Sequence, residues 1–171
     1  MGVYPQAVDR VDALLAAWRA EQPEMATLNL EIVKRTGRLA ALVDVATQRA
    51  LSGFDITYAE FDVLATLRRA GKPYRLKPGR LARESMLTTG GTANILQRLT
   101  AAGLVEREPD PDDRRSSWVR LTRDGARTAT AVAKATSAAY ADLLGGVPEE
   151  TLDALNAALR ATLIALDDGP P

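Results

Sequence analysis

One stretch limits the possible folds more than any other: residues 103–121, GLVEREPDPDDRRSSWVRL. Apolar and polar residues alternate on both sides of the central EPDPDDRRSS run, which predicts two short strands joined as a β-hairpin with a charged tip. Two prolines keep ladder hydrogen bonds out of such a tip, and its three aspartates can hydrogen-bond to their own backbone. We therefore expect a stiff tip that holds Arg114 and Arg115 away from the protein.

Arg114 and Arg115 are the first candidate DNA contacts. Guanidinium groups presented on a narrow projection fit the electronegative minor groove of A·T-rich DNA. The alternative is that they pair with the neighbouring aspartates. Both arrangements are compatible, because an arginine has five donors and an acidic neighbour need not use all of them.

The segment before the hairpin predicts a pair of helices that carries the second set of candidate DNA contacts. Pro78 opens the first helix, with Leu81 and Met86 facing inward, and Gly103 ends the second. The polar residues of the second helix suit base edges and phosphates, and in a helix-turn-helix this helix enters the major groove. They are Thr88, Thr89, Thr92, Asn94, Gln97 and Arg98, with Thr88 and Thr89 also able to cap the helix. The alternative for this polar set is an ordinary solvated helix face.

Positive charge is concentrated in the same region of the chain. Residues 72–123 contain 11 Lys or Arg against 6 Asp or Glu, a net charge of +5, whereas the rest of the chain carries 11 against 16, a net charge of −5. The chain contains no cysteine and no histidine, so it lacks the residues for a thiol switch, a Cys/His metal site or a histidine triad. We predict no metal, no cofactor and no enzymatic activity. An enzyme using Glu60 and Asp62 is disfavoured, because residues two apart on a helix point away from each other.

Long amphipathic helices are predicted on both sides of this region. Apolar residues recur at helical spacing within residues 6–51 and 123–166, interrupted by Pro23 in the first range and by Gly145-Gly146 in the second. Between them, Thr57 and Glu60 form a capping box for a further helix. No apolar run is long enough to span a membrane and no signal peptide is recognisable, so a cytoplasmic protein is expected. The predicted fold is one domain, residues 1–171, mainly α with a small β-hairpin.

The hairpin also carries a resemblance to a known family. Its D-P-x-D-R-R tip and V-x-L-T-x-x-G exit resemble the wing of the multiple antibiotic resistance regulator (MarR) family, and TTGGTANILQRLTAAGL is similar to that family's recognition helix. The resemblance covers nearly the whole chain. It implies a winged helix-turn-helix over residues 57–122, with dimerisation helices at 6–51 and 123–166. The extra N-terminal helix is similar to that of a subgroup that senses urate or aconitate.

The same resemblance suggests a ligand pocket made by Trp18, Asp62 and Arg107. Chemically, an indole offers a flat wall, an arginine a planar fork for a carboxylate, and an aspartate an acceptor. The alternatives are interface packing for Trp18 and a structural ion pair between Asp62 and Arg107. The subgroup's second pocket arginine falls at Ile95 in this chain, which disfavours urate and favours a less anionic or more apolar aromatic ligand.

The function predicted from the sequence is a homodimeric, ligand-responsive repressor. Two recognition helices related by a dyad would read a palindromic operator in double-stranded DNA, and a small aromatic or carboxylate effector would release it. The alternative is a winged-helix module that binds proteins rather than DNA.

Overall fold

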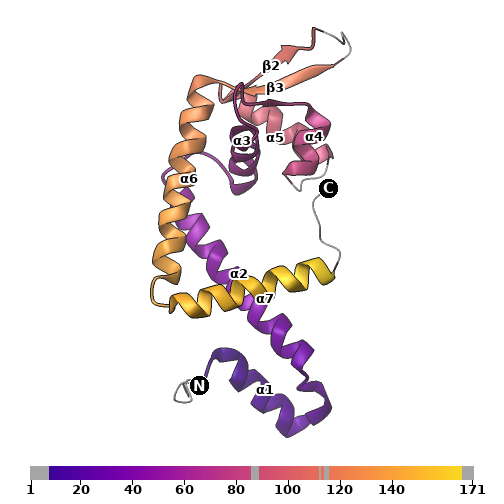
Figure 1. Cartoon of the computed structure of the whole chain (residues 1–171), viewed down its shortest axis with the longest axis vertical. Helices are drawn as coiled ribbons and strands as arrows, with labels where there is room; N and C mark the ends of the chain where they lie inside the picture. Colours follow the sequence, from indigo (N-terminus) through magenta and orange to yellow (C-terminus); the bar gives the residue numbers. More distant parts are fainter. Residues whose placement is uncertain (1–7, 86–88, 112, 114–115, 167–171) are drawn as a thin grey trace. The chain divides into compact units, whose positions relative to one another are not determined.

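The computed structural model describes residues 8–85, 89–111, 113 and 116–166, which fall into two compact units (Figure 1). One unit ends at Val45 and the other begins at Ala46. The described chain is mainly helical with one small antiparallel sheet, so the predicted fold class is confirmed. Among the described helices, none combines the length and the apolar character needed to cross a bilayer.

The first unit contains α1 (Arg10–Glu21), a short 3-10 turn η1 (Pro23–Met25) and most of α2 (Leu28–Leu51). Asp9 caps α1 in a capping box with Asp12, so the described helix begins later than the predicted residue 6. Only Val11 and Leu15 of α1 are buried. Polar contacts therefore hold much of this helix in place.

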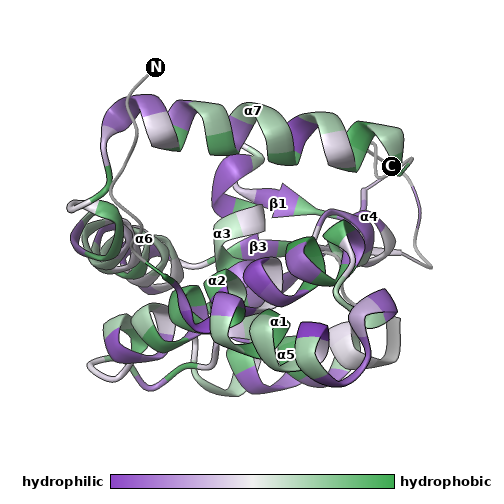
Figure 2. Cartoon of the chain, turned by 90° about the horizontal axis from the view of Figure 1, so that it is seen from below, coloured by the Kyte–Doolittle hydropathy of each residue, from purple (hydrophilic) through white to green (hydrophobic). Residues whose placement is uncertain are grey.

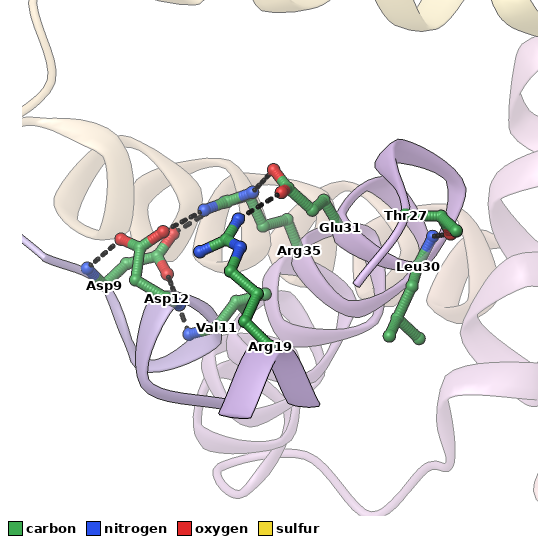
Figure 3. Close-up of polar contacts among 8 residues, drawn as sticks. All are labelled: Asp9, Val11, Asp12, Arg19, Thr27, Leu30, Glu31 and Arg35. Atoms are coloured by element: carbon green, nitrogen blue, oxygen red, sulfur yellow. Dashed lines mark hydrogen bonds and ion pairs between the residues drawn. The ribbon is translucent and has the colours of Figure 1, made fainter. Parts of the chain in front are cut away.

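Arg35 is the centre of those contacts (Figure 3). Its Nε lies 2.8 Å from Asp9 Oδ2, its Nη2 2.6 Å from Asp12 Oδ1 and its Nη1 2.9 Å from Glu31 Oε2. The hydrogen bond from Arg35 holds the pKa of the Asp9 carboxyl below its ordinary value. Arg35 thus contacts three carboxylates. Arg19 contacts one of them, Glu31, at 3.1 Å.

The second unit is built on α3 (Tyr58–Arg69), which packs against α4 (Pro78–Glu84) and α5 (Thr89–Ala101). The predicted capping box is present: Glu60 N–H donates to Thr57 Oγ1, and Thr57 N–H donates to Glu60 Oε2 at 2.7 Å. The core is contributed by all of these helices and by the sheet. Its buried members are Val63, Leu64, Leu67, Leu76, Leu81, Leu96, Leu99, Val105, Val119, Leu121 and Ala129.

The sheet has the strand order β1-β3-β2, with β1 at Arg75–Leu76, β2 at Val105–Pro109 and β3 at Ser117–Leu121. Alternation along the strands separates two faces. Val105, Val119 and Leu121 face the core, and the register places Trp118 and Arg120 on the opposite face. The sequence had suggested that Pro109 belongs to the tip. In the structure it instead pairs in register with Ser117 and is the last residue of strand β2. An edge strand tolerates it, because β2 has no further partner on its other side in this sheet.

Helix α6 (Arg123–Leu144) follows β3 without a loop. Thr122 caps it by accepting from Gly125 N–H at 2.9 Å, and the same hydroxyl donates to Gly103 O at 2.8 Å. Gly125 passes so close to the turn after α5 that an added Cβ would lie 1.8 Å from Leu104 O. The start of α6 thus packs directly against the turn that follows α5.

Helix α7 (Glu149–Ala165) buries none of its residues. Leu155, Leu159 and Leu163 recur every four residues and are exposed, and in Figure 2 the apolar turns of α7 alternate with polar ones along one helix. This stripe is unpartnered within the described chain.

Candidate nucleic-acid interface

Helices α4 and α5 form the predicted helix-turn-helix. Pro78 occupies the first turn of α4, where its missing N–H costs no helical hydrogen bond. Leu81 is fully buried, as predicted, whereas Arg80 and Arg83 are exposed. Met86 and Thr88 lie outside the described residues, so their predicted roles stay predictions.

The exposed side of α5 carries three of the predicted reading residues. Asn94, Gln97 and Arg98 stand at positions i, i+3 and i+4, which places them on one helix face, and all three are exposed. Thr89 begins the helix. This face combines an amide pair with a cation, and amides can bond adenine edges while arginine bonds guanine or phosphate.

Thr92 is a correction to the sequence prediction. It is only 3% exposed and therefore does not belong to the outer face. The reason is helical phase: Thr92 precedes Leu96 by four residues and Leu99 by seven, and both leucines are in the core. The sequence grouped Thr92 with the candidate DNA contacts because threonine is polar, although its spacing from Leu96 and Leu99 places it on the buried side of α5.

Arg98 has a structural contact that the sequence did not reveal. Its Nε lies 3.0 Å from Oε1 of Glu60, whose side chain is 5% exposed, while 67% of the Arg98 side chain remains accessible. The other carboxylate oxygen of Glu60 accepts from Thr57 Oγ1 at 2.8 Å. One end of the Arg98 guanidinium thus ties α5 to the start of α3, and the rest faces solvent. The capping-box pattern pointed to Glu60 as a cap, but its second partner is almost forty residues away.

The outer face of the sheet is a layer of charged residues around Trp118. The Arg75 guanidinium and the Lys77 ammonium lie over the indole ring, 4.8 Å and 4.4 Å from its centre. Glu108 bridges two arginines, 2.6 Å from Arg75 Nη1 and 3.4 Å from Arg120 Nε. Most of the positive charge on this face is therefore neutralised within the protein.

The base of the hairpin tip is closed by its own polar groups. Asp110 N–H donates to Ser116 O at 3.2 Å, and Ser116 N–H donates to Asp113 O at 2.9 Å. Lys77 bonds both the Asp110 carboxylate and the Ser116 hydroxyl. These bonds close the base of the turn through the backbone of Asp110 and Asp113 and through the Asp110 side chain, whereas the predicted bonds from aspartate side chains to their own backbone stay a prediction. Arg114 and Arg115 lie outside the described residues, and their projection stays a prediction.

The three predicted ligand residues have different surroundings. Asp62 is half-buried on α3, and burial raises the pKa of its carboxyl while Arg69 partly offsets that rise. Arg107 is exposed on β2, and its Nη1 donates to Ser117 Oγ at 3.1 Å. The contacts of the described residues do not include an Asp62–Arg107 ion pair. Trp18, 37% exposed, belongs to the unit that ends at Val45, and the three-residue pocket stays a prediction.

A hollow between α3 and α6 lies near Asp62 in the same unit. Its volume is about 910 Å³, and Phe61, Arg69 and Tyr140 are among its lining residues. Tyr140 OH shares a hydrogen bond of 2.9 Å with Thr47 Oγ1. Burial raises the pKa of Tyr58, and the nearby charge of Asp62 adds to the rise. The sequence did not reveal this hollow, because it is formed where α3 packs against α6, and local sequence pattern does not specify which helices pack together.

A helix-turn-helix followed by a two-stranded hairpin defines a winged helix, a class of DNA-binding fold. Residues 54–116 match the MarR family. The transcriptional regulator PecS of Dickeya dadantii is 33% identical over 115 residues, which are 67% of this chain and 69% of PecS. The chain therefore belongs to the MarR family of DNA-binding transcriptional regulators.

Solved structures agree with the fold. A mutant of MarR from Escherichia coli, solved in complex with operator DNA, superimposes with a TM-score of 0.64 at 29% identity, covering 80% of this chain and 99% of that one. AbsC, a MarR family regulator from Streptomyces coelicolor, gives a TM-score of 0.71 at 24% identity, covering 84% of this chain and 97% of that one. The prediction that the chain is a regulator rather than an enzyme is confirmed by this family membership.

Proposed function

We propose that the chain acts as a homodimeric repressor of a palindromic operator and that a small aromatic or carboxylate ligand releases it. The observation that carries the proposal is the exposed face of α5, where Asn94, Gln97 and Arg98 stand together, while Glu106, Glu108 and Arg120 on the outer face of the sheet form ion pairs within the protein. In this arrangement α5 reads base edges in the major groove, and Arg114 and Arg115 of the tip contact the minor groove.

The dimer in this proposal is formed by the helices of residues 6–51 and 123–166. Support comes from the apolar stripe of α7, which buries nothing within the described chain. Large exposed apolar side chains at helical spacing favour association, since covering them gains roughly 25 cal/mol per Å². A dimer also matches the need of a palindrome for two reading helices about one helical turn of DNA apart.

The ligand in this proposal binds near Asp62, with Trp18 and Arg107 as the further residues suggested by the sequence. Support comes from the raised pKa of Asp62, because a half-buried carboxyl with a perturbed pKa is a common feature of binding sites. Ile95 is half-buried on α5, where the urate-sensing subgroup has an arginine. A ligand with a single carboxylate and an aromatic body suits this composition better than urate.

A gel-shift titration with the DNA upstream of the chain's own gene tests the proposal. We expect saturable binding that weakens steeply with salt, because neutralised phosphates release counterions. Alanine at both Arg114 and Arg115 should weaken this binding by orders of magnitude without changing the circular dichroism spectrum. Unaltered affinity in the double variant would exclude the wing contact, and binding to protein partners alone would favour the protein-interaction alternative.

A further inference from the structure

A cleft of about 830 Å³ lies at the root of the hairpin, where the end of α3, the loop 72–74 before β1 and the end of strand β3 meet the first half of α6. All of its lining residues belong to the unit that begins at Ala46. The hairpin tip joins β3 at Ser117, whereas Arg120 and Leu121, which line the cleft, lie at the other end of this strand. The cleft is therefore separate from the surface proposed to read DNA.

The cleft is lined by cations and by no carboxylate among its described residues. Its charged lining residues are Arg68, Lys72, Arg120, Arg123, Arg127 and Lys134. Arg120 pairs with Glu106 at 2.7 Å and Arg127 with Asp124 at 2.8 Å. The other four form no ion pair with any described residue. Lys72, Arg123 and Lys134 are exposed and Arg68 is partly buried, so solvent weakens the repulsion among these four positive charges, and an anion placed among them offsets what remains.

Two further features favour an anion at this place. The first is the N-terminus of the 22-residue helix α6, which Thr122 and Arg123 place in the cleft wall, where the helix dipole adds positive potential.

The second feature is the conformation of Tyr74. Its φ is 60°, a left-handed conformation that non-glycine residues rarely adopt. Two hydrogen bonds hold it there, from Tyr74 N–H to Gly71 O at 2.6 Å and from Leu121 N–H to Tyr74 O at 3.0 Å.

This backbone conformation positions the Tyr74 ring against a cleft cation. The Arg68 guanidinium carbon lies 4.3 Å from the centre of the ring. Stacking on an aromatic face restricts the Arg68 side chain and leaves the in-plane N–H groups of the guanidinium available. A preorganised arginine loses less rotamer entropy when it binds an oxyanion than a freely rotating one does.

We propose that this cleft binds a small organic anion with at least two negative charges. A single charge would leave most of the repulsion among Arg68, Lys72, Arg123 and Lys134 in place, whereas a phosphate ester or a polycarboxylate matches them. The site requires neither DNA nor the ligand proposed near Asp62, so it can be tested without either.

Isothermal titration calorimetry of the full chain with pyrophosphate, citrate and acetate tests this site. We expect saturable binding of pyrophosphate or citrate and none of acetate, and comparison of the first two distinguishes phosphoryl from carboxylate chemistry. Lys72→Ala combined with Arg123→Ala should weaken binding at least tenfold. Arg49→Ala is the matched control, since Arg49 is exposed, forms no ion pair with a described residue and does not line the cleft.

Two results would overturn the proposal. One is the absence of saturable binding by either polyanion, or an equal loss of affinity in Arg49→Ala, which would indicate nonspecific attraction. The other is a loss of operator affinity in the Lys72/Arg123 double variant without any added anion, which would make the cleft a DNA contact. If the wild type binds polyanions but no operator, the proposed repressor function fails while the anion site stands.

Discussion

Gly125→Ala should destabilise the protein strongly, because this position is where α6 meets the turn after α5. The new Cβ would lie 1.8 Å from Leu104 O and 2.8 Å from Leu104 C. Real Cβ atoms essentially never come closer than 3.0 Å to another heavy atom, so the two backbones must separate by at least 1.2 Å, the difference between 3.0 Å and 1.8 Å. Both atoms in the way are backbone atoms, so no flexible side chain can make room.

The energy follows from the contacts that this separation breaks. Thr122 N–H donates to Leu104 O at 3.1 Å and Thr122 Oγ1 donates to Gly103 O at 2.8 Å, and neither hydrogen bond survives such a shift. Overpacking costs about 1–3 kcal/mol and each lost hydrogen bond about 0.5–1.5 kcal/mol. Alanine in a helix recovers about 0.5–1 kcal/mol of this. The net loss is about 1–5.5 kcal/mol, which at its upper end is a large part of the stability of an ordinary domain.

Urea denaturation followed by far-ultraviolet circular dichroism measures this loss. Gly37→Ala is the control, because Gly37 is exposed within α2 and its added Cβ meets nothing within 4 Å. We expect the control to gain up to about 1 kcal/mol, while Gly125→Ala loses several. An unchanged midpoint and slope for Gly125→Ala would refute the close approach of α6 to Leu104.

Three further predictions concern the reading face, the buried carboxyl and the dimer. Asn94→Ala or Gln97→Ala should relax base preference at defined operator positions by about 1–3 kcal/mol each, measured by competition with mutated operators, whereas a uniform loss would indicate phosphate contacts. Asp62→Asn should be more stable than the wild type near neutral pH. Burial raises the pKa of Asp62 in the folded protein above its ordinary value of 3.8. The free energy of unfolding of the wild type therefore falls as the pH rises from 3.8 through the raised pKa. The difference in urea midpoints should vanish below pH 3.8, and a difference that persists there would contradict this cause. Removal of α7 should abolish both dimerisation and operator binding, as followed by analytical ultracentrifugation and gel shift, and a folded monomer with full operator affinity would refute the dimer proposal.

The boundaries of several elements could be predicted because they depend on nearby residues. Thr57 with Glu60, and Pro78, each begin a helix where the sequence placed one. Gly103, with a φ of 70°, lies just beyond the end of α5, because its backbone adopts a conformation that other residues avoid. Caps and breakers act over a few residues, so they are visible in the sequence.

The contacts that could not be predicted join residues far apart in the chain. Lys77 and Arg75 cover Trp118 only because β1 pairs with β3 in one register, and nothing local to residues 75–77 specifies that register. The closeness of Gly125 to Leu104 likewise depends on how two helices pack. Thr92 is different, because its spacing from Leu96 and Leu99 was present in the sequence and should have outweighed its polarity.

Because the start of α6 packs against the turn that follows α5, a movement of the far end of α6 rotates the helix about its start. Its 22 residues extend about 33 Å, so a sideways shift of ~3 Å at the Leu144 end turns the helix by about 5°. Since Gly125 lies close against Leu104 in the turn that follows α5, we expect that rotation to move this turn. If α5 reads DNA as proposed, an occupant of the hollow lined by Tyr140 that moves α6 away from α3 would therefore change the orientation of that helix.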